Sequence, residues 1–280
     1  MSQAFVLGCR SALTALLLSA LTIGIAAADD DDPRLAAGIK DNSFLIDEAY
    51  NQGPGDIQHI LTLQRQYRDW NLAFTQEHSL GTQAHQLSYS IPYLRLRSDG
   101  QRASGIGDVE VTYRYQAWME TAITPAFAAG VTLIAPTGSQ RRGLGDGSFG
   151  LEGKLAFSKI VSDRVTLHAN AAVTNMFDVQ GHSPTSYMIG GSGIYAVTRD
   201  FNFMLEGLIE WNESVNDDRA LERETTFTLS PGFRKAINFP DDKQFVFGFA
   251  TPITFSREKP TDYGLFFYLS FEHNVLKKKR

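Results

Sequence analysis

The chain has 280 residues and a formal net charge of −5, and apolar residues make up 43% of it. This acidic balance argues against nucleic acid as a partner, because proteins that bind nucleic acid carry basic patches for its phosphates. The single cysteine, Cys9, excludes a disulfide framework. After residue 28, no apolar run approaches the roughly 18 residues that a membrane-spanning helix needs.

The first 28 residues have the layout of a secretory signal peptide. Arg10 provides the charge of the n-region, an apolar run extends from about Ser11 to Ile25, and three alanines follow. We predict cleavage after Ala28 and an N-terminal periplasmic segment at residues 29–56. The alternative is an uncleaved membrane anchor, for which the apolar run is short.

The mature chain shows a sequence period of two. In the segment from Gly107 to Trp118, apolar and polar residues alternate strictly: Val109, Val111, Tyr113 and Tyr115 fall on one face, and Glu110, Thr112, Arg114 and Gln116 on the other. Such alternation is typical of a strand with one apolar and one polar side. The pattern recurs at 200–212, 244–255 and 262–272. The predicted fold class is all-β.

The alternation and the turn residues between segments predict about twelve strands. They are Gln58–Gln64, Trp70–Ser79, Gln86–Arg95, Asp108–Trp118, Thr121–Ala135, Phe149–Lys159, Arg164–Asn175, Ser186–Val197, Asp200–Asn212, Arg223–Lys235, Gln244–Phe255 and Asp262–Glu272. Several reach the length of about ten tilted residues that crosses a bilayer. Pro92, Pro125, Pro231 and Pro252 fall inside four of these strands, where each removes a ladder hydrogen bond, so ten or fourteen strands are alternatives.

The connections between these strands alternate in length. Long polar links at 97–107, 136–147, 177–185 and 212–222 alternate with short ones near 81, 119, 162 and 199. Long loops at one end and short turns at the other are typical of a transmembrane antiparallel β-barrel in the outer membrane. We therefore expect the barrel at residues 57–273 and a basic C-terminal tail at 274–280. A soluble β-sandwich is the alternative.

One glycine pattern needs a separate interpretation. Gly145, Gly147 and Gly150 match the G-x-G-x-x-G spacing of dinucleotide-binding sites. That motif requires a helix directly after the glycines, whereas a strand is expected here. We interpret the glycines as the end of a long loop and expect no cofactor.

Three stretches resemble a family of Gram-negative outer-membrane barrels labelled as transporters or as proteins of a phenol-degradation meta-pathway. They are EAYNQGPGDIQH from Glu48, GIGDVEVTYRYQ from Gly105, and APTGSQRRGLGDGSFGLEGKLAFSK from Ala135. The resemblance implies an outer-membrane channel or transporter for passive passage of small molecules, including hydrophobic or aromatic ones. It supplies no catalytic or binding residues.

Charged residues on the polar faces of the strands are the candidate functional residues. By alternation, eight are expected to line the lumen: Glu77, Glu110, Arg114, Glu152, Lys154, Glu206, Glu210 and Arg234. Such charges can select the solutes that pass. They can equally form a salt-bridged network that fills a narrow interior.

Two other classes of function are alternatives. A lipase-like barrel enzyme would need a serine and a histidine, and Ser158 and His168 lie on neighbouring predicted strands, where they can approach each other. A structural or adhesive barrel would use its loops, and the loop at 212–222 with Glu224 carries five acidic residues. The six histidines show no metal-binding spacing, so we expect no metal. Expected partners are outer-membrane lipid or lipopolysaccharide, a small-molecule solute and the barrel-assembly machinery.

Overall fold

The computed structural model describes residues 32–39, 41, 43–98, 101–216, 218–240 and 243–276. The predicted signal peptide at 1–28, Asp217 and residues 277–280 of the basic tail lie outside the described residues. Among the described residues, no helix has the length and apolar character needed to span a membrane.

Two short 3-10 turns and fifteen strand segments make up the described secondary structure. The turns are η1 (Leu35–Ala37) and η2 (Gln140–Arg142). The strands are β1 (Asp56–Gln66), β2 (Asp69–Ser79), β3 (His85–Ser98), β4 (Gln101–Ile106), β5 (Val109–Trp118), β6 (Ala126–Ala135), β7 (Gly150–Ile160), β8 (Val165–Met176), β9 (Thr185–Thr198), β10 (Phe201–Val215), β11 (Leu221–Phe239), β12 (Lys243–Ala250), β13 (Ile253–Ser256), β14 (Asp262–Tyr263) and β15 (Leu265–Asn274).

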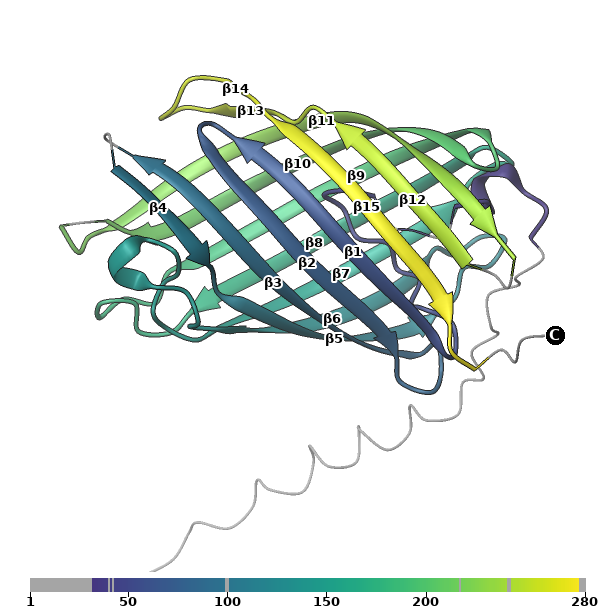
Figure 1. Cartoon of the computed structure of the whole chain (residues 1–280), viewed down its shortest axis with the longest axis horizontal. Coiled ribbons are helices and arrows are strands. Elements are labelled where there is room, and N and C mark those ends of the chain that lie inside the picture. The colour runs from purple at the N-terminus through teal and green to yellow at the C-terminus, as the bar shows by residue number, and fades with distance from the viewer. Residues whose placement is uncertain are drawn as a thin grey trace, which may run out of the picture.

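These segments form one closed antiparallel barrel of twelve strands (Figure 1). Three barrel strands are each interrupted once, so that β4 continues as β5, β12 as β13, and β14 as β15. Sequential strands pair with each other, and β1 pairs with β15 to close the sheet. The prediction of an all-β transmembrane barrel with about twelve strands is confirmed.

The prolines lie where the hydrogen-bond ladder is already irregular. Pro125 precedes β6, and Pro252 occupies the break between β12 and β13. Pro231 lies in β11 opposite that same break, and the N–H of Thr251 donates to its carbonyl at 3.0 Å. Pro92 lies in β3 opposite the break between β4 and β5. A strand tolerates proline at such bulges because no ladder bond is lost.

The outer surface of the barrel is apolar and its inner surface is polar. In β5, Val111 and Tyr113 are exposed, whereas Arg114 and Gln116, on the opposite face, are buried. Exposed large apolar side chains alternate with buried side chains in the same way along β7, β8, β10 and β15. The buried side chains include polar ones such as His168, Glu206 and Ser270, with Met204, Phe266 and Tyr268 among the exceptions. An apolar exterior on a closed barrel is the surface that lipid covers, and the closed sheet leaves no edge unpaired in the bilayer. The protein is therefore an outer-membrane barrel.

The glycine-rich loop between β6 and β7 folds onto Asp108. The carboxylate of Asp108 accepts hydrogen bonds from the backbone N–H of Gly138 at 2.8 Å and of Asp146 at 3.0 Å. A Cβ atom on Gly145 would lie 2.3 Å from Asp108 Oδ1, so this close approach requires glycine. Strand β7 follows the glycines where a dinucleotide site requires a helix.

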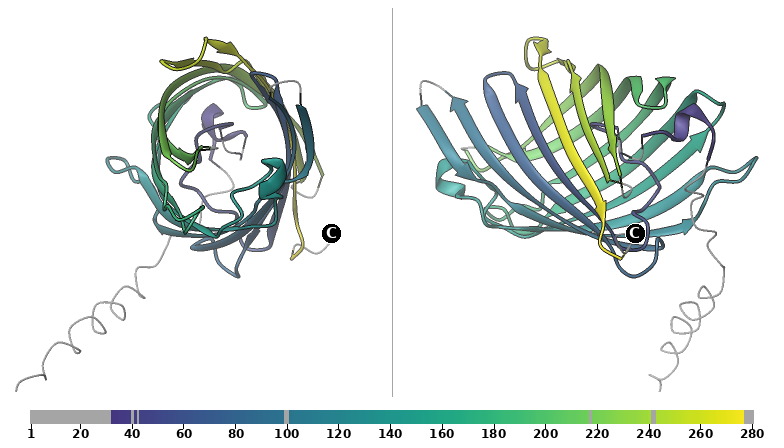
Figure 2. Two further views of the ribbon diagram at one scale, coloured as in Figure 1. Left: turned by 90° about the vertical axis from the view of Figure 1, so that its left-hand side faces the viewer. Right: turned by 45° about the vertical axis from the view of Figure 1, so that its right-hand side comes forward.

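A segment ahead of the first strand lies inside the barrel (Figure 2). We call residue 41 together with residues 43–52 the plug segment. Its backbone and side chains form hydrogen bonds with inward-facing side chains of β1, β3, β5, β7, β8, β9, β10, β11 and β15. The predicted N-terminal periplasmic segment at 29–56 thus includes a stretch within the bore, a position that the sequence analysis did not predict.

Candidate functional site

The plug segment is anchored at its start by a buried carboxylate. Asp41 accepts hydrogen bonds from Gln58 Nε2 at 2.9 Å, from Ser270 Oγ at 2.7 Å and from the hydroxyl of Tyr268. Arg234 donates to the Asp41 carbonyl at 2.7 Å. Asp41 is 1% exposed. A carboxylate that is held by several donors and a neighbouring cation is a strong attachment point.

The middle of the plug segment binds β9 and β10. The hydroxyls of Ser43 and Ser192 lie 2.6 Å apart. Glu206 Oε1 accepts the backbone N–H groups of Leu45 and Ile46 at 2.7 and 3.1 Å. These bonds satisfy backbone groups that have no strand partner in the bore, where an unpaired amide would be costly.

The next residues of the plug segment bind β7 and β8. Asp47 forms an ion pair with Lys154 at 3.0 Å, and its backbone N–H donates to Asn170 at 2.7 Å. The N–H of Ala49 donates to Ser158 Oγ at 2.7 Å, and the same oxygen lies 2.7 Å from His168 Nδ1.

Arg114 of β5 holds the end of the plug segment. Its guanidinium donates to Asn51 Oδ1 at 2.6 Å, to the Tyr50 carbonyl at 2.9 Å and to the Glu48 carbonyl at 3.2 Å. Asn51 is also bound by Gln116, whose side-chain oxygen accepts its N–H at 3.0 Å. Because Arg114 bridges three plug residues, it acts as a clamp as well as a charge on the barrel wall.

Two apolar residues of the plug segment fit against glycines in the barrel wall. A Cβ on Gly248 would lie 2.3 Å from the ring of Phe44, and a Cβ on Gly190 would lie 2.5 Å from Ile46 Cδ1. The ring of Phe44 also stacks on Phe266 with centroids 5.3 Å apart. Inward-facing glycines within strands are the sequence signal that sequence reasoning missed, since such glycines often mark a close approach of another part of the chain.

The pKa values of the three acidic residues in the plug segment are shifted in different directions. Burial raises the pKa of Glu48 to about 8, although Arg114 partly offsets this shift. Burial also raises the pKa of Asp41, against the opposing effect of Arg234. At Asp47 burial again acts to raise the pKa, but Lys154 and Arg114 outweigh it, so the pKa lies below its ordinary value.

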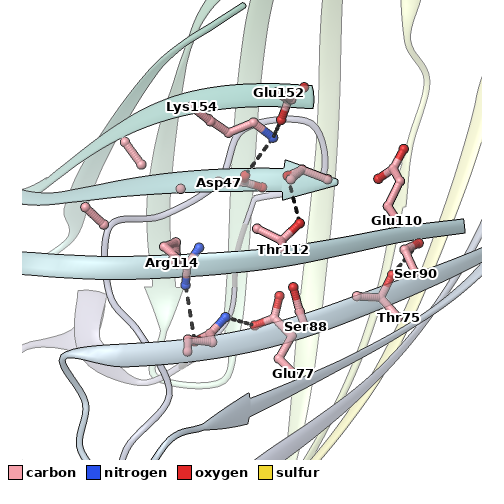
Figure 3. A pocket seen from close by; sticks show the side chains of 15 residues that line it. Asp47, Thr75, Glu77, Ser88, Ser90, Glu110, Thr112, Arg114, Glu152 and Lys154 are labelled. Atoms are coloured by element: carbon pink, nitrogen blue, oxygen red, sulfur yellow. Dashed lines mark hydrogen bonds and ion pairs between the residues drawn. The ribbon is translucent and has the colours of Figure 1, made fainter. Parts of the chain in front are cut away.

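A polar cavity lies in the bore beside the plug segment (Figure 3). Its volume is about 800 Å³, including space open to the lumen, and β2, β3, β5, β6 and β7 form its wall. Most of its lining is polar, with hydroxyl pairs such as Thr112 and Thr132 at 2.8 Å, and alanine and glycine are the apolar residues that line it. Four carboxylates and two cations line it: Asp47, Glu77, Glu110, Glu152, Arg114 and Lys154.

Glu110 differs from the other carboxylates of the cavity. Glu77 accepts a hydrogen bond from Gln86 at 2.9 Å, and Glu152 lies 3.3 Å from Lys154. Glu110 is exposed and forms no hydrogen bond or ion pair with any described residue (Figure 3). Its carboxylate is therefore available to a solute or an ion in the cavity.

The structure places the eight predicted lumen residues in three different surroundings. Five line the cavity: Glu77, Glu110, Arg114, Glu152 and Lys154. Glu206 and Arg234 bind the plug segment, and Glu210 accepts a hydrogen bond from Thr226 at 3.3 Å. Their part in solute passage remains a prediction. Sequence reasoning did not find the plug residues Asp41, Ser43 and Asp47.

The described residues contain no group of three or more histidine, cysteine or acidic side chains placed to hold a metal ion. The expected approach of Ser158 and His168 is observed, but Ser158 Oγ already accepts the Ala49 N–H, and Ser158 is 1% exposed. A serine nucleophile needs access to its substrate. In this arrangement the plug segment covers the pair.

A closed twelve-strand barrel with an apolar outer surface and a polar bore has the architecture of outer-membrane channel barrels. The chain belongs to the family described as "Putative MetA-pathway of phenol degradation", whose model matches residues 41–261. This match confirms the resemblance seen in the sequence.

Several solved structures are similar to the chain. The COG4313 outer membrane channel from Pseudomonas putida F1 has a TM-score of 0.61 and 15% identity, over 80% of this chain and 97% of that one. The NanC porin has a TM-score of 0.47 and 10% identity, over 77% and 98% of the two chains. The KdgM porin has a TM-score of 0.46 and 9% identity, over 78% and 99%. No curated protein sequence matches the chain.

Proposed function

We propose that the protein is a passive outer-membrane channel for small solutes, and that the plug segment closes it until that segment moves. The observation that carries this proposal is the division of the bore into a part bound by the plug segment and an open polar cavity. Family membership and the fold support the channel role, since the bore is the one route through a closed barrel. No covalent step or cofactor is needed.

The cavity favours a solute that carries hydrogen-bond donors or a positive charge. Its lining has hydroxyls, four carboxylates and two cations, with no aromatic side chain among the lining residues. The family description refers to phenol degradation, and a phenolic hydroxyl would suit such a wall better than an aromatic hydrocarbon would. Rings of carboxylates favour cations in channels. We therefore expect weak selectivity for cations over anions.

Reversal of the charge on Glu110 tests this proposal. In planar bilayers under a salt gradient, Glu110→Lys should shift the reversal potential toward anion selectivity, because the free carboxylate of the cavity is replaced by a cation. The matched control Glu258→Lys makes the same change in the exposed loop between β13 and β14 and should leave the potential unchanged. An unchanged potential in Glu110→Lys would show that ions do not pass through this cavity. Arg114→Glu should also alter selectivity, but it removes contacts to the plug segment as well.

The enzyme alternative is less well supported. We infer that Ser158 and His168 hold the plug segment, because the Ser158 hydroxyl lies between Ala49 and the histidine ring. The purified protein should show no lipase activity. Hydrolysis that is lost in Ser158→Ala would contradict this inference.

A further inference from the structure

Arginines gather on the outer surface of the barrel at the end where the long loops lie. Arg65 of β1 is opposite Trp70 of β2, and Trp70 is opposite Arg95 of β3. One step nearer the end of the barrel, Arg97 of β3 is opposite Arg102 of β4. We call Arg65, Arg95, Arg97 and Arg102 the arginine cluster.

The arginine cluster is on the face of the sheet that meets lipid. Residues two apart on a strand share a face, and Arg95 and Arg97 continue the series of Ile91 and Tyr93, which are 37% and 49% exposed. Arg65 likewise follows Leu61, which is 39% exposed. Arg95, Arg97 and Arg102 are themselves exposed. The cluster therefore lies at the edge of the apolar outer surface, at the end with the long loops, where lipid headgroups are expected.

The positive charges of the cluster have no acidic partners within the described part of the chain. None of its four arginines forms an ion pair there. The nearby carboxylate of Asp69 accepts the backbone N–H of Arg97 at 2.7 Å. Arg97 and Arg102 are direct cross-strand partners, and like charges in such positions are destabilising unless an anion lies between them.

At the long-loop end, the opposite side of the barrel has cations that form ion pairs within the protein. In the hairpin of β10 and β11, Arg223 forms an ion pair with Glu213 at 2.6 Å. Lys259 from the neighbouring loop forms one with Glu224 at 2.7 Å. These two cations are thus neutralised by the protein itself. The arginine cluster on the wall formed by β1 to β4 has no such ion pairs among the described residues.

We propose that the arginine cluster binds the phosphate groups of lipopolysaccharide in the outer leaflet. Guanidinium groups form bidentate, charge-assisted bonds with phosphate, and clustered arginines beside an apolar membrane surface recognise anionic lipid headgroups. Trp70, in the same row, supplies an aromatic side chain of the kind found at membrane interfaces. The long-loop end of a bacterial barrel faces outward, where lipopolysaccharide is the phosphate-bearing lipid.

Binding of lipid A to the full-length mature protein in detergent tests the proposal. The probes are diphosphorylated lipid A and its dephosphorylated form, and the measurement is the dissociation constant. Arg95→Gln/Arg97→Gln should weaken binding of the diphosphorylated form by at least tenfold, since each headgroup contact contributes about fivefold, or about 1 kcal/mol. The control Arg223→Gln/Arg257→Gln removes two arginines from the same end of the barrel and should change the constant by less than twofold.

Heat-modifiable migration on a gel shows that each variant is folded, and Arg95→Lys/Arg97→Lys should recover part of the affinity. Equal weakening by the test and control pairs would overturn the proposal, because it would indicate a general effect of net charge. Equal affinity of the native protein for phosphorylated and dephosphorylated lipid A would overturn it as well.

Discussion

The bore of this barrel contains two parts that are built on the same strands but have opposite properties. In the closed part, inward-facing side chains such as Ser158 and Gln116 bind the backbone of the plug segment. Three inward-facing positions along the same strands toward the long-loop end, Glu152 and Glu110 face an open cavity instead. The polar face of one strand thus serves two purposes. Where it meets another segment, its groups bind that segment, and where it does not, they line the cavity, in which Glu110 has no partner among the described residues.

A substitution at Asp41 should have the largest effect on the difference between these two parts of the bore. Asp41→Asn replaces one of the two side-chain oxygens that accept from Gln58, Ser270 and Tyr268 by an amide group, so at least one of these buried donors loses its acceptor. Leaving a buried donor without a partner costs about 2 kcal/mol, which corresponds to about thirtyfold weaker docking of the plug segment.

Hydrogen exchange of residues 43–52 should therefore accelerate in Asp41→Asn, and the open fraction of the channel should rise. Asp178→Asn, in an exposed loop, is the control and should change neither. Unchanged exchange in Asp41→Asn would mean that this anchor is dispensable and that other contacts keep the bore closed.

A smaller effect is expected from pH, through Glu48. Burial raises the pKa of Glu48 in the docked plug segment to about 8, so docking favours the neutral carboxyl. The contribution of neutral Glu48 to the stability of the docked plug segment is fully present below the ordinary pKa of a glutamate. It is lost as the pH rises toward about 8. Asp41, whose pKa is also raised, acts in the same direction, whereas the lowered pKa of Asp47 matters only in more acidic solution.

Channel opening should increase by up to about tenfold per pH unit in that range, since one proton is released. Conductance between pH 5 and pH 9 measures the increase, and Glu48→Gln should flatten it. The charged groups that act on Glu48 are Arg114, Asp41, Arg234 and Glu77. Because the arginines stay protonated in this range, a response that persists in Glu48→Gln would assign the effect to Asp41 or Glu77.

Most of the barrel could be predicted from the sequence because the lipid and the bore impose a strict period of two. The alternation in β5 and the long links at 97–107 and 136–147 were enough to predict a closed barrel of about twelve strands. The prolines argued for fewer or more strands, because the sequence does not show that Pro231 and Pro252 meet at one interruption of the ladder.

The plug segment could not be predicted in the same way. An irregular segment has no period, and its partners are polar side chains that alternation already assigns to the bore. Gly190 and Gly248 were the available signals, because each leaves space for an apolar plug residue. Only the tertiary arrangement connects those glycines to Ile46 and Phe44. The role of Arg114 as a clamp, rather than as a free charge, depends on the same arrangement.

The central claim is that the plug segment closes the bore and must move before solute passes. Ser43 and Ser192 offer a direct test, because their hydroxyls lie 2.6 Å apart across the boundary between plug and wall. Cysteines at these positions can form a disulfide, whose sulfur atoms lie about 2.05 Å apart. The natural chain has one cysteine, Cys9, in the predicted signal peptide.

The decisive measurement is the planar-bilayer conductance of Ser43→Cys/Ser192→Cys before and after reduction. The account predicts few or no openings in the oxidised protein, recovery of native openings after reduction, and no redox response in either single-cysteine variant. Native conductance in the fully oxidised double variant would contradict it, because solute would then be passing a plug segment that cannot move.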